Sequence, residues 1–319
     1  MVEPLFLEPY FQEKMWGGQK LQTEFNYQIP SKTTGECWAI SAHKNGPAVV
    51  KNGPYKGCTL RELWDKEPSL FANQNHASEF PLLTKIIDAK QDLSVQVHPD
   101  DAYGLEHEGE FGKTECWYVL AAEPGAKIVY GHHAKTKAEL ENMIDQQEWD
   151  ALLKTKEVHP GDFIYVPSGT LHAIGAGIMV LETQQSSDTT YRVYDYDRVD
   201  PKTHQLRDLH LQQSKDVTTV PDVEPVLDFK TTQIDQAQVT QLVENEFFVV
   251  EKVTNAKGRT NLMTTGPYTL VSVIAGQGEL LIAQQRYPLT KGTHFILPNG
   301  IKEWSIQGEM ELIVAYPNK

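Results

Sequence analysis

Four side chains able to bind a metal ion lie in three short segments of the sequence. Gln96 and His98 are separated by one residue in the run LSVQVHP. Because successive side chains of a strand point to opposite faces, both would share one face, with the apolar residues on the other. Glu115 opens the run ECWYVLA, and His172 follows a Pro/Gly turn at the end of GDFIYVPSGTLH. Two imidazoles, a carboxylate and an amide form a nitrogen and oxygen ligand set suited to zinc or another divalent ion.

Each of the four also has an ordinary structural interpretation. Gln96 and His98 would fit a solvent-exposed strand face, Glu115 a loop cap, and His172 a buried core position. The three cysteines of the chain are far apart and never in C-x-x-C spacing. They therefore favour neither a disulfide framework nor a cysteine-rich zinc site. A metal bound by this chain would depend on His, Glu and Gln side chains.

The order Q-x-H, then E, then G-x5-P-x-G-x2-H resembles the cupin motifs, with Gln in place of one histidine. More specifically, LSVQVHPDD, GKTECWYVL, VPSGTLHAIG and residues 182–195 resemble the type I mannose-6-phosphate isomerases in their short bacterial form. The segments WGG at residues 16–18 and GECW at residues 35–38 are similar to the same family. The resemblance runs from about residue 10 to 200, and the weaker C-terminal half is similar to the family's second, metal-free cupin.

This resemblance implies an aldose–ketose isomerase that interconverts mannose 6-phosphate and fructose 6-phosphate through a cis-enediol. It also implies one zinc ion per chain, bound by Gln96, His98, Glu115 and His172. A sugar phosphate is the expected partner. Asp101 stands where longer members have a lysine near the phosphate, so the resemblance leaves the phosphate contacts open.

Three further residues match the family's active site. Arg192 matches its arginine, and Lys113 and Glu182 match polar residues around the substrate. Glu182 is one candidate for the base that moves a proton between C2 and C1. Lys113 is the other, if burial beside a metal lowers its pKa. Arg192 would stay protonated and bind enediolate or phosphate oxygens; its structural alternative is an ion pair with Asp188, Asp195 or Asp197.

Two other functions use the same ligand set. Two histidines and a carboxylate also describe a non-haem iron oxygenase, although Gln96 as a fourth ligand would use a position that oxygen needs. A non-catalytic sugar-binding cupin, with a structural metal or none, would bind sugar phosphates without turnover.

Short β-rich runs separated by Gly and Pro must position these residues, a pattern typical of sandwiches and barrels. We expect strands at residues 93–99, 115–121, 162–167, 178–184, 247–253, 268–276 and 310–316. Apolar residues at helical spacing predict helices at 60–74 and 136–156. Together with the resemblance, they predict a mainly β fold of two cupin-type jelly-roll barrels with a few packed α-helices.

The best boundary lies in the polar stretch from about 198 to 245, which is low in strand-like alternation. We predict a metal-binding catalytic cupin domain with helical insertions at residues 1–230. A second, degenerate cupin-like domain follows at 231–319. Its segment GTHFILPNGIKE echoes GDFIYVPSGTLH, but Glu303 stands at the position of His172. The second domain should therefore be metal-free.

The composition limits the partners of the chain. It has 319 residues, with 43 Asp and Glu against 29 Lys and Arg, a formal charge of −14. Such a surface repels nucleic acid and anionic lipid, so a phosphorylated substrate needs a local exception. No apolar run is long enough to span a bilayer, and no export signal is visible. We expect a cytoplasmic monomer or homodimer that binds neither nucleic acid nor membrane.

Overall fold

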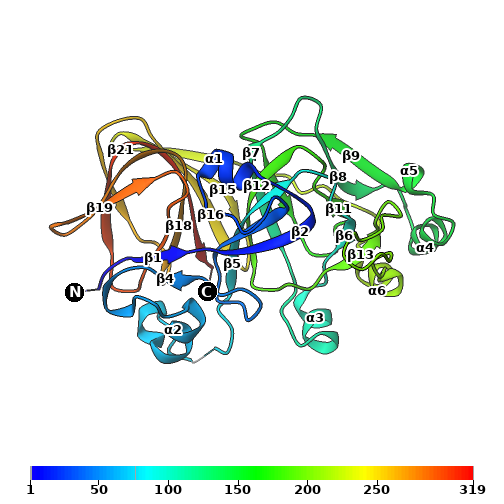
Figure 1. Cartoon of the computed structure of the whole chain (residues 1–319), viewed down its shortest axis with the longest axis horizontal. Coiled ribbons are helices and arrows are strands. Elements are labelled where there is room, and N and C mark those ends of the chain that lie inside the picture. Colours follow the sequence, from blue (N-terminus) through cyan, green and yellow to red (C-terminus); the bar gives the residue numbers. More distant parts are fainter. Residues whose placement is uncertain (1, 76, 319) are drawn as a thin grey trace.

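The structure, a computed structural model, describes residues 2–75 and 77–318. Met1 and Lys319, the outer ends of the two predicted domains, lie outside the described residues. The chain forms three antiparallel sheets with short helices around them, as Figure 1 shows. The prediction of a mainly β fold with a few packed helices is confirmed.

Two sheets belong to the N-terminal two thirds of the chain. The six-stranded sheet has the order β10 (Phe163–Val166), β7 (Glu115–Ala121), β12 (Ile178–Gln185), β5 (Leu82–Ala89), β2 (Tyr10–Gly18) and β3 (Thr34–Ile40). The five-stranded sheet has the order β13 (Tyr191–Tyr194), β6 (Val95–Val97), β11 (His172–Ala173), β8 (Lys127–His132) and β9 (Leu153–Glu157).

The third sheet has ten strands. Its main path is β14 (Lys230–Ile234), β15 (Ala237–Glu244), β16 (Phe248–Asn255), β21 (Glu303–Pro317), β18 (Thr269–Ile282), β20 (His294–Leu297), β1 (Leu5–Glu8) and β4 (Val49–Val50). β17 (Arg259–Met263) pairs with β21, and β19 (Gln285–Thr290) pairs with β18. β3 also pairs with β5, and among the described residues none of the three sheets closes into a barrel.

The described residues also form six short α-helices: α1 (Lys20–Phe25), α2 (Leu60–Lys66), α3 (Asp101–His107), α4 (Lys137–Asp145), α5 (Trp149–Leu152) and α6 (Leu211–Val217). Two 3₁₀ turns, η1 (Gly53–Tyr55) and η2 (Pro68–Phe71), lie in the N-terminal part. Within the described residues, the structure has no helix long and apolar enough to cross a membrane.

All seven predicted strands are present, but two other predictions need correction. Residues 153–156, expected to end a long helix, form β9, whose backbone pairs with β8. The apolar residues at helical spacing that predicted one long helix belong to α4 and α5, which end at Leu152. The stretch 198–245 was expected to be low in strands, yet residues 230–234 and 237–244 form β14 and β15. Their exposed Lys, Thr and Gln side chains hide the alternation that identifies a buried strand.

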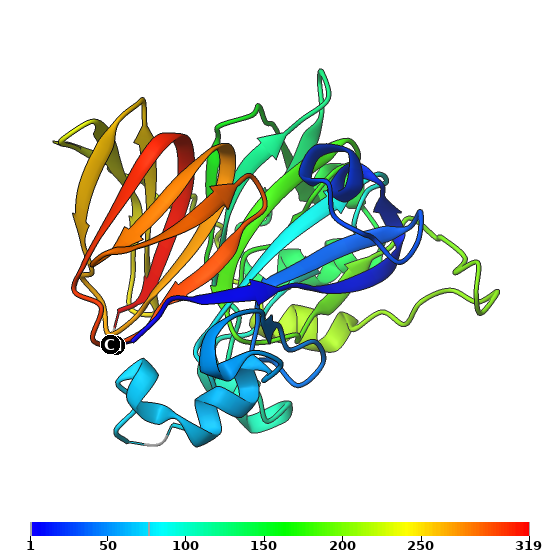
Figure 2. The same ribbon diagram turned by 60° about the vertical axis from the view of Figure 1, so that its left-hand side comes forward.

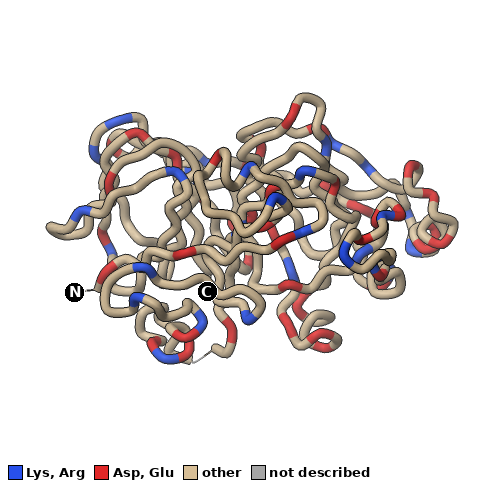
Figure 3. The backbone as a smooth tube through the Cα atoms, in the orientation of Figure 1, with Lys and Arg blue, Asp and Glu red and all other residues tan. Residues whose placement is uncertain are grey.

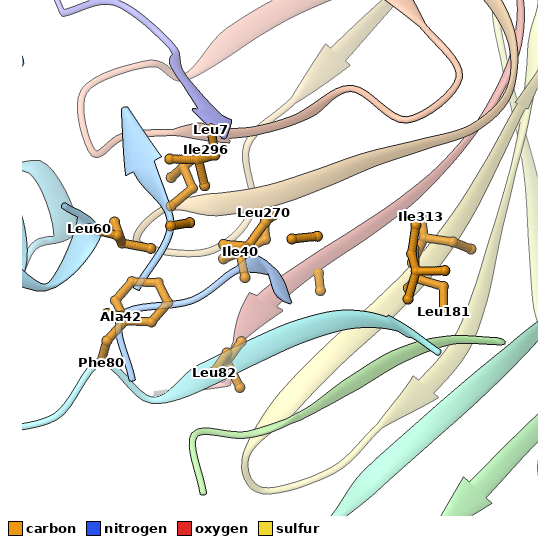
Figure 4. Packing of buried hydrophobic residues seen from close by; sticks show 14 of the residues in the cluster. Leu7, Ile40, Ala42, Leu60, Phe80, Leu82, Leu181, Leu270, Ile296 and Ile313 are labelled. Atoms are coloured by element: carbon orange, nitrogen blue, oxygen red, sulfur yellow. The ribbon is translucent and has the colours of Figure 1, made fainter. Parts of the chain in front are cut away.

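A large apolar cluster joins the six-stranded sheet to the ten-stranded one. Figure 4 shows Ile40, Leu82 and Leu181 of the first sheet near Leu270 and Ile313 of the second. β1 links the two sheets. Its Leu5 pairs with Ile296 in β20 of the ten-stranded sheet, and the chain then continues into β2 of the six-stranded sheet. Figure 2 shows this N-terminal strand running from the C-terminal sheet toward the centre of the molecule. These side chains bury one face of the six-stranded sheet against the ten-stranded sheet. The opposite face stays available for polar groups.

Candidate active site

Strand pairing brings the four predicted metal ligands together. In the five-stranded sheet, Gln96 lies opposite His172 on one side and opposite Arg192 on the other. The turn before His172 passes through Gly169, which has a φ of 82° and donates its N–H to the carbonyl of His98 (2.8 Å). A glycine adopts this left-handed conformation without the cost of a Cβ. The turn therefore holds His172 beside the strand that carries His98.

The ligand atoms of His98, Glu115 and His172 all lie within 4.8 Å of one another. The Nε2 atom of His98 is 3.5 Å from Glu115 Oε2, and that of His172 is 3.4 Å from Glu115 Oε1. All three side chains are buried. The amide nitrogen of Gln96 is 3.2 Å from His172 Nε2, and turning that amide over would present its oxygen instead. The four predicted ligands are therefore neighbours.

The hydrogen bonds of the two imidazoles set their protonation. His98 Nδ1 is 2.9 Å from the carbonyl of Thr189, and His172 Nδ1 is 2.9 Å from that of Thr170. Because a carbonyl only accepts, both Nδ1 atoms carry the proton. Burial lowers the pKa of His98 well below its usual value and that of His172 to about 4. Two bare Nε2 atoms thus face the carboxylate of Glu115, and this set of acceptors fits a divalent cation.

The ammonium of Lys113 contacts two of the acceptor atoms that a metal ion would bind. It donates to Glu115 Oε2 and to His98 Nε2, the latter at 3.0 Å. Burial by itself would lower the pKa of Lys113, but the charges of Glu115 and Glu182 outweigh burial and raise it. A proton shuttle needs the opposite shift. With two carboxylates beside it, Lys113 is therefore firmly charged in this structure, and its role as a proton shuttle stays a prediction.

Glu182 has the properties that a buried general base requires. Its Oε2 accepts from Trp117 Nε1 (3.0 Å), which also donates to Glu115 Oε1 (3.1 Å). Its Oε1 is buried and has no hydrogen-bond partner among the described residues. Burial and the charge of Glu115 raise the pKa of Glu182, against the opposing effects of Lys113 and Lys85. A raised pKa and a free lone pair suit a carboxylate that accepts a proton near neutral pH.

A cavity of about 310 Å³ opens over these residues, and Gln96, Lys113, Glu182 and Arg192 all line it. Figure 3 shows acidic and basic residues mixed along the whole chain. The wall of the cavity differs, since five basic residues outnumber three acidic ones. The basic ones are Lys14, Lys85, Lys113, Arg192 and Arg207, and the acidic ones are Glu36, Glu182 and Asp188. This cavity is a local exception to the net charge of −14.

The side chain of Arg192 is half-buried and has no carboxylate partner among the described residues. Its Nη1 donates to the carbonyl of Asp208 (2.7 Å), and its Nε has no partner among the described residues. Asp195 instead binds Arg198 and Arg207. The structural alternative of an ion pair between Arg192 and a nearby aspartate is therefore wrong for the described residues. Burial and the charge of Arg207 lower the pKa of Arg192, which a bound anion would counteract.

Three cavity residues, Lys14, Glu36 and Lys85, were missed as site residues. Glu36 belongs to the GECW segment, whose resemblance to the family was the available signal. No spacing rule connects these residues, because they lie on β2, β3 and β5 and meet only through the sheet.

A larger cavity of about 730 Å³ lies between the N-terminal segment and β19, and none of the predicted site residues lines it. Its most buried ionisable group, His294, already contacts Tyr27 Oη (2.7 Å) and Ser272 Oγ (2.8 Å). The smaller cavity is the candidate active site, because it is lined by the predicted site residues and because Glu182 Oε1 and Arg192 Nε have no hydrogen-bond partner among the described residues.

Comparisons with known proteins cover the whole chain. The family model "Phosphomannose isomerase type I, catalytic domain" matches residues 5–120, and "Mannose-6-phosphate isomerase, cupin domain" matches residues 238–317. The chain is 54% identical to the mannose-6-phosphate isomerase of Streptococcus mutans, with 100% of both chains covered. It is 52% identical to mannose-6-phosphate isomerase ManA of Bacillus subtilis, with 99% of both covered.

A solved structure shows the same fold. The crystal structure of the mannose 6-phosphate isomerase from Bacillus subtilis superimposes with a TM-score of 0.95 at 47% identity. The superposition covers 99% of this chain and 100% of that one.

Proposed function

The chain belongs to the type I mannose-6-phosphate isomerase family, and from this membership we propose that it interconverts mannose 6-phosphate and fructose 6-phosphate. We propose further that one zinc ion is required and that the reaction passes through a cis-enediol. The observation that carries the proposal is the single cavity in which a buried carboxylate with a free oxygen, Glu182, faces the ligand cluster and Arg192.

Gln96, His98, Glu115 and His172 would hold the ion, since their donor atoms are neutral imidazole nitrogens, a carboxylate and an amide. When bound, zinc would polarise an oxygen of the sugar and so acidify the neighbouring C–H bond. Lys113 would keep Glu115 oriented through the ion pair that it forms with that carboxylate.

Glu182 would move the proton. Its Oε1 would take the proton from C2 of mannose 6-phosphate and return it to C1, while the hydroxyl proton of O2 passes to O1, which gives fructose 6-phosphate. Trp117 supports this role, since its indole N–H holds Oε2 and leaves Oε1 free toward the cavity. We assign Lys113 to charge stabilisation rather than proton transfer, because its ammonium is held by carboxylates.

Arg192 would bind the negatively charged part of the substrate. A guanidinium offers paired N–H donors that match phosphate or enediolate oxygens. Its unpartnered Nε at the cavity supports this role.

The remaining expectations stay proposals. We propose a division into domains at residues 1–230 and 231–319, each with the cupin jelly-roll form. We also propose a cytoplasmic location and a monomeric or homodimeric state.

Isomerisation in deuterated water tests the proton-transfer route. Fructose 6-phosphate made from unlabelled mannose 6-phosphate should carry solvent deuterium at C1, measured by NMR, because a carboxylic acid exchanges its proton. Complete retention of the original hydrogen would contradict a base-mediated cis-enediol route. Equal turnover with and without oxygen would exclude the iron oxygenase alternative.

A further inference from the structure

A row of side chains crosses four strands of the six-stranded sheet on the face that meets the cavity. Strand register places Trp38 of β3 opposite Lys85 of β5, Lys85 opposite Glu182 of β12, and Glu182 opposite Trp117 of β7. Side chains directly opposite on neighbouring strands lie close enough to interact. The proposed base therefore has a buried lysine on one side and an indole on the other.

Lys85 is the unusual member of this row. Its side chain is 5% exposed, yet its ammonium is 3.8 Å from Glu182 Oε1 and 4.0 Å from Glu36 Oε2. Among the described residues, it makes no hydrogen bond. A buried ammonium without an acceptor is costly, and both Lys85 and the free Oε1 of Glu182 line the cavity. An oxygen of a polar molecule bound in the cavity would have a donor in the Lys85 ammonium and an acceptor in Glu182 Oε1, neither of which makes another hydrogen bond among the described residues.

The contacts of Glu36 keep its carboxylate beside the ammonium of Lys85. Its Oε2 accepts from Trp38 Nε1 (2.7 Å), and its Oε1 pairs with Lys14 Nζ (3.2 Å). Trp38, fixed by this bond, lies under the ammonium of Lys85, 4.6 Å from the ring centroid. The Lys85 ammonium is thus attracted by the indole face of Trp38 and by the Glu36 carboxylate, in addition to Glu182.

We propose that Glu36 is a positioning residue for Lys85, and that the Lys85 ammonium held in this way binds an oxygen of the substrate beside Glu182. This inference rests on the proposed function. It adds two residues to the reaction and gives the acidic residue of GECW a role that involves no contact with the substrate.

A double-mutant cycle for isomerisation tests the inference, with Glu36→Gln, Lys85→Met and the double variant. Gln keeps the length of Glu36 and can still accept from Trp38, and Met keeps most of the apolar stem of Lys85 without its charge. Loss of a hydrogen bond from a charged group predicts a fall in kcat/KM of roughly 10- to 100-fold for Lys85→Met, mainly through KM. Glu36→Gln should cost less, and the double variant should equal Lys85→Met within about twofold.

Two controls separate positioning from a general loss of structure. Glu311→Gln makes the same change in the C-terminal sheet, where Glu311 pairs with Lys252 (3.1 Å), and should leave kcat/KM unaltered. Zinc content and the melting temperature of each variant show whether it is folded and metal-loaded. A second cycle of Glu36→Gln with Lys14→Met should give a smaller coupling than the cycle with Lys85.

The outcomes distinguish the inference from the proposed function. If the wild-type chain does not isomerise mannose 6-phosphate, both are overturned. If the wild type is active but Glu36→Gln costs as much with Met at position 85 as with Lys, Glu36 acts directly and the positioning role alone is overturned. Wild-type kinetics in folded Lys85→Met would overturn the contact between Lys85 and the substrate.

Discussion

Neighbouring charges set the properties of the individual ionisable residues in the cavity as much as burial does. His172 and Glu182 follow burial, which lowers the pKa of the imidazole and raises that of the carboxyl group. Glu36 and Lys113 do the opposite, because a partner of opposite charge outweighs burial in each case. The site therefore combines neutral histidines with a firmly charged Lys113.

Arg192→Ala should lose most of the isomerase activity and keep its zinc. The guanidinium contacts the cavity but is not among the predicted metal ligands, so its removal should cost about 100-fold or more in kcat/KM. Steady-state kinetics and elemental analysis of the same sample check this. A variant that loses its metal would place Arg192 in the structural shell of the metal site.

Glu182→Gln should retain substrate binding and lose turnover. The amide keeps the size of the side chain but cannot accept the C2 proton, so kcat should fall by at least about 100-fold while KM changes little. The matched variant Lys113→Met should lose less in kcat if Lys113 is not the base. A larger loss for Lys113→Met than for Glu182→Gln would reverse the two roles.

At the residue scale, the sequence was enough to predict side chains that the structure brings together as a group able to hold a metal ion. Gln96 and His98 were recognisable because alternation placed them on one face, and Glu115 and His172 because of the surrounding motifs. Which of Glu182 and Lys113 suits the role of general base depends on the residues that surround each one in the folded chain. The raised pKa of Lys113 follows from Glu115, two residues away, and from Glu182, which is distant in sequence and meets it only in the folded chain.

Register between strands positions the site at the scale of elements. β12 pairs with both β5 and β7, so one strand brings Glu182 between Lys85 and Trp117. The sequence indicated most of the strands, because buried strands show a clear apolar pattern. It could not indicate which strands are neighbours, and so the row from β3 to β7 was not predictable.

The contact of β2 with β3 gives a prediction at this scale. A Cβ added at Gly17 would lie 2.4 Å from the backbone nitrogen of Gly35 and 2.6 Å from the carbonyl oxygen of Thr33. Backbone atoms cannot move aside cheaply, so Gly17→Ala should lower the free energy of unfolding by about 1–3 kcal/mol. Denaturant unfolding measures this, and a stability equal to wild type would contradict the close packing.

Thr136→Ala is a matched control for that change. Thr136 caps α4 by accepting from the N–H of Glu139, and loss of a cap costs about 1 kcal/mol. Because α4 lies away from the cavity lining, this variant should be less stable yet retain wild-type kcat/KM.

Net charge and local charge differ at the scale of the whole molecule. The chain carries a formal charge of −14, while basic residues predominate around the cavity. The composition indicated that a phosphorylated substrate would need such an exception, but not where it lies. The exception arises when residues from both N-terminal sheets meet at one cavity.

Glu36 links this charge arrangement to the stability of the whole chain. Burial would raise its pKa, but Lys14 and Lys85 lower it to about 2, against about 4.3 in an unfolded chain. Its contribution, about 3 kcal/mol at most, is present above pH about 4.3 and is lost as the pH falls toward 2. The stability difference between wild type and Glu36→Gln should therefore shrink below pH about 4.3 in denaturant titrations. A difference independent of pH would contradict the low pKa of Glu36.

The most direct test of the central claim is a coupled assay for fructose 6-phosphate formation from mannose 6-phosphate, with chelator-treated protein before and after addition of zinc. Circular dichroism on the same sample confirms that the metal-free chain is still folded. The account predicts that the metal-free protein is inactive and that one equivalent of zinc restores turnover. Metal-free protein that interconverts the two sugar phosphates at the full rate would contradict it.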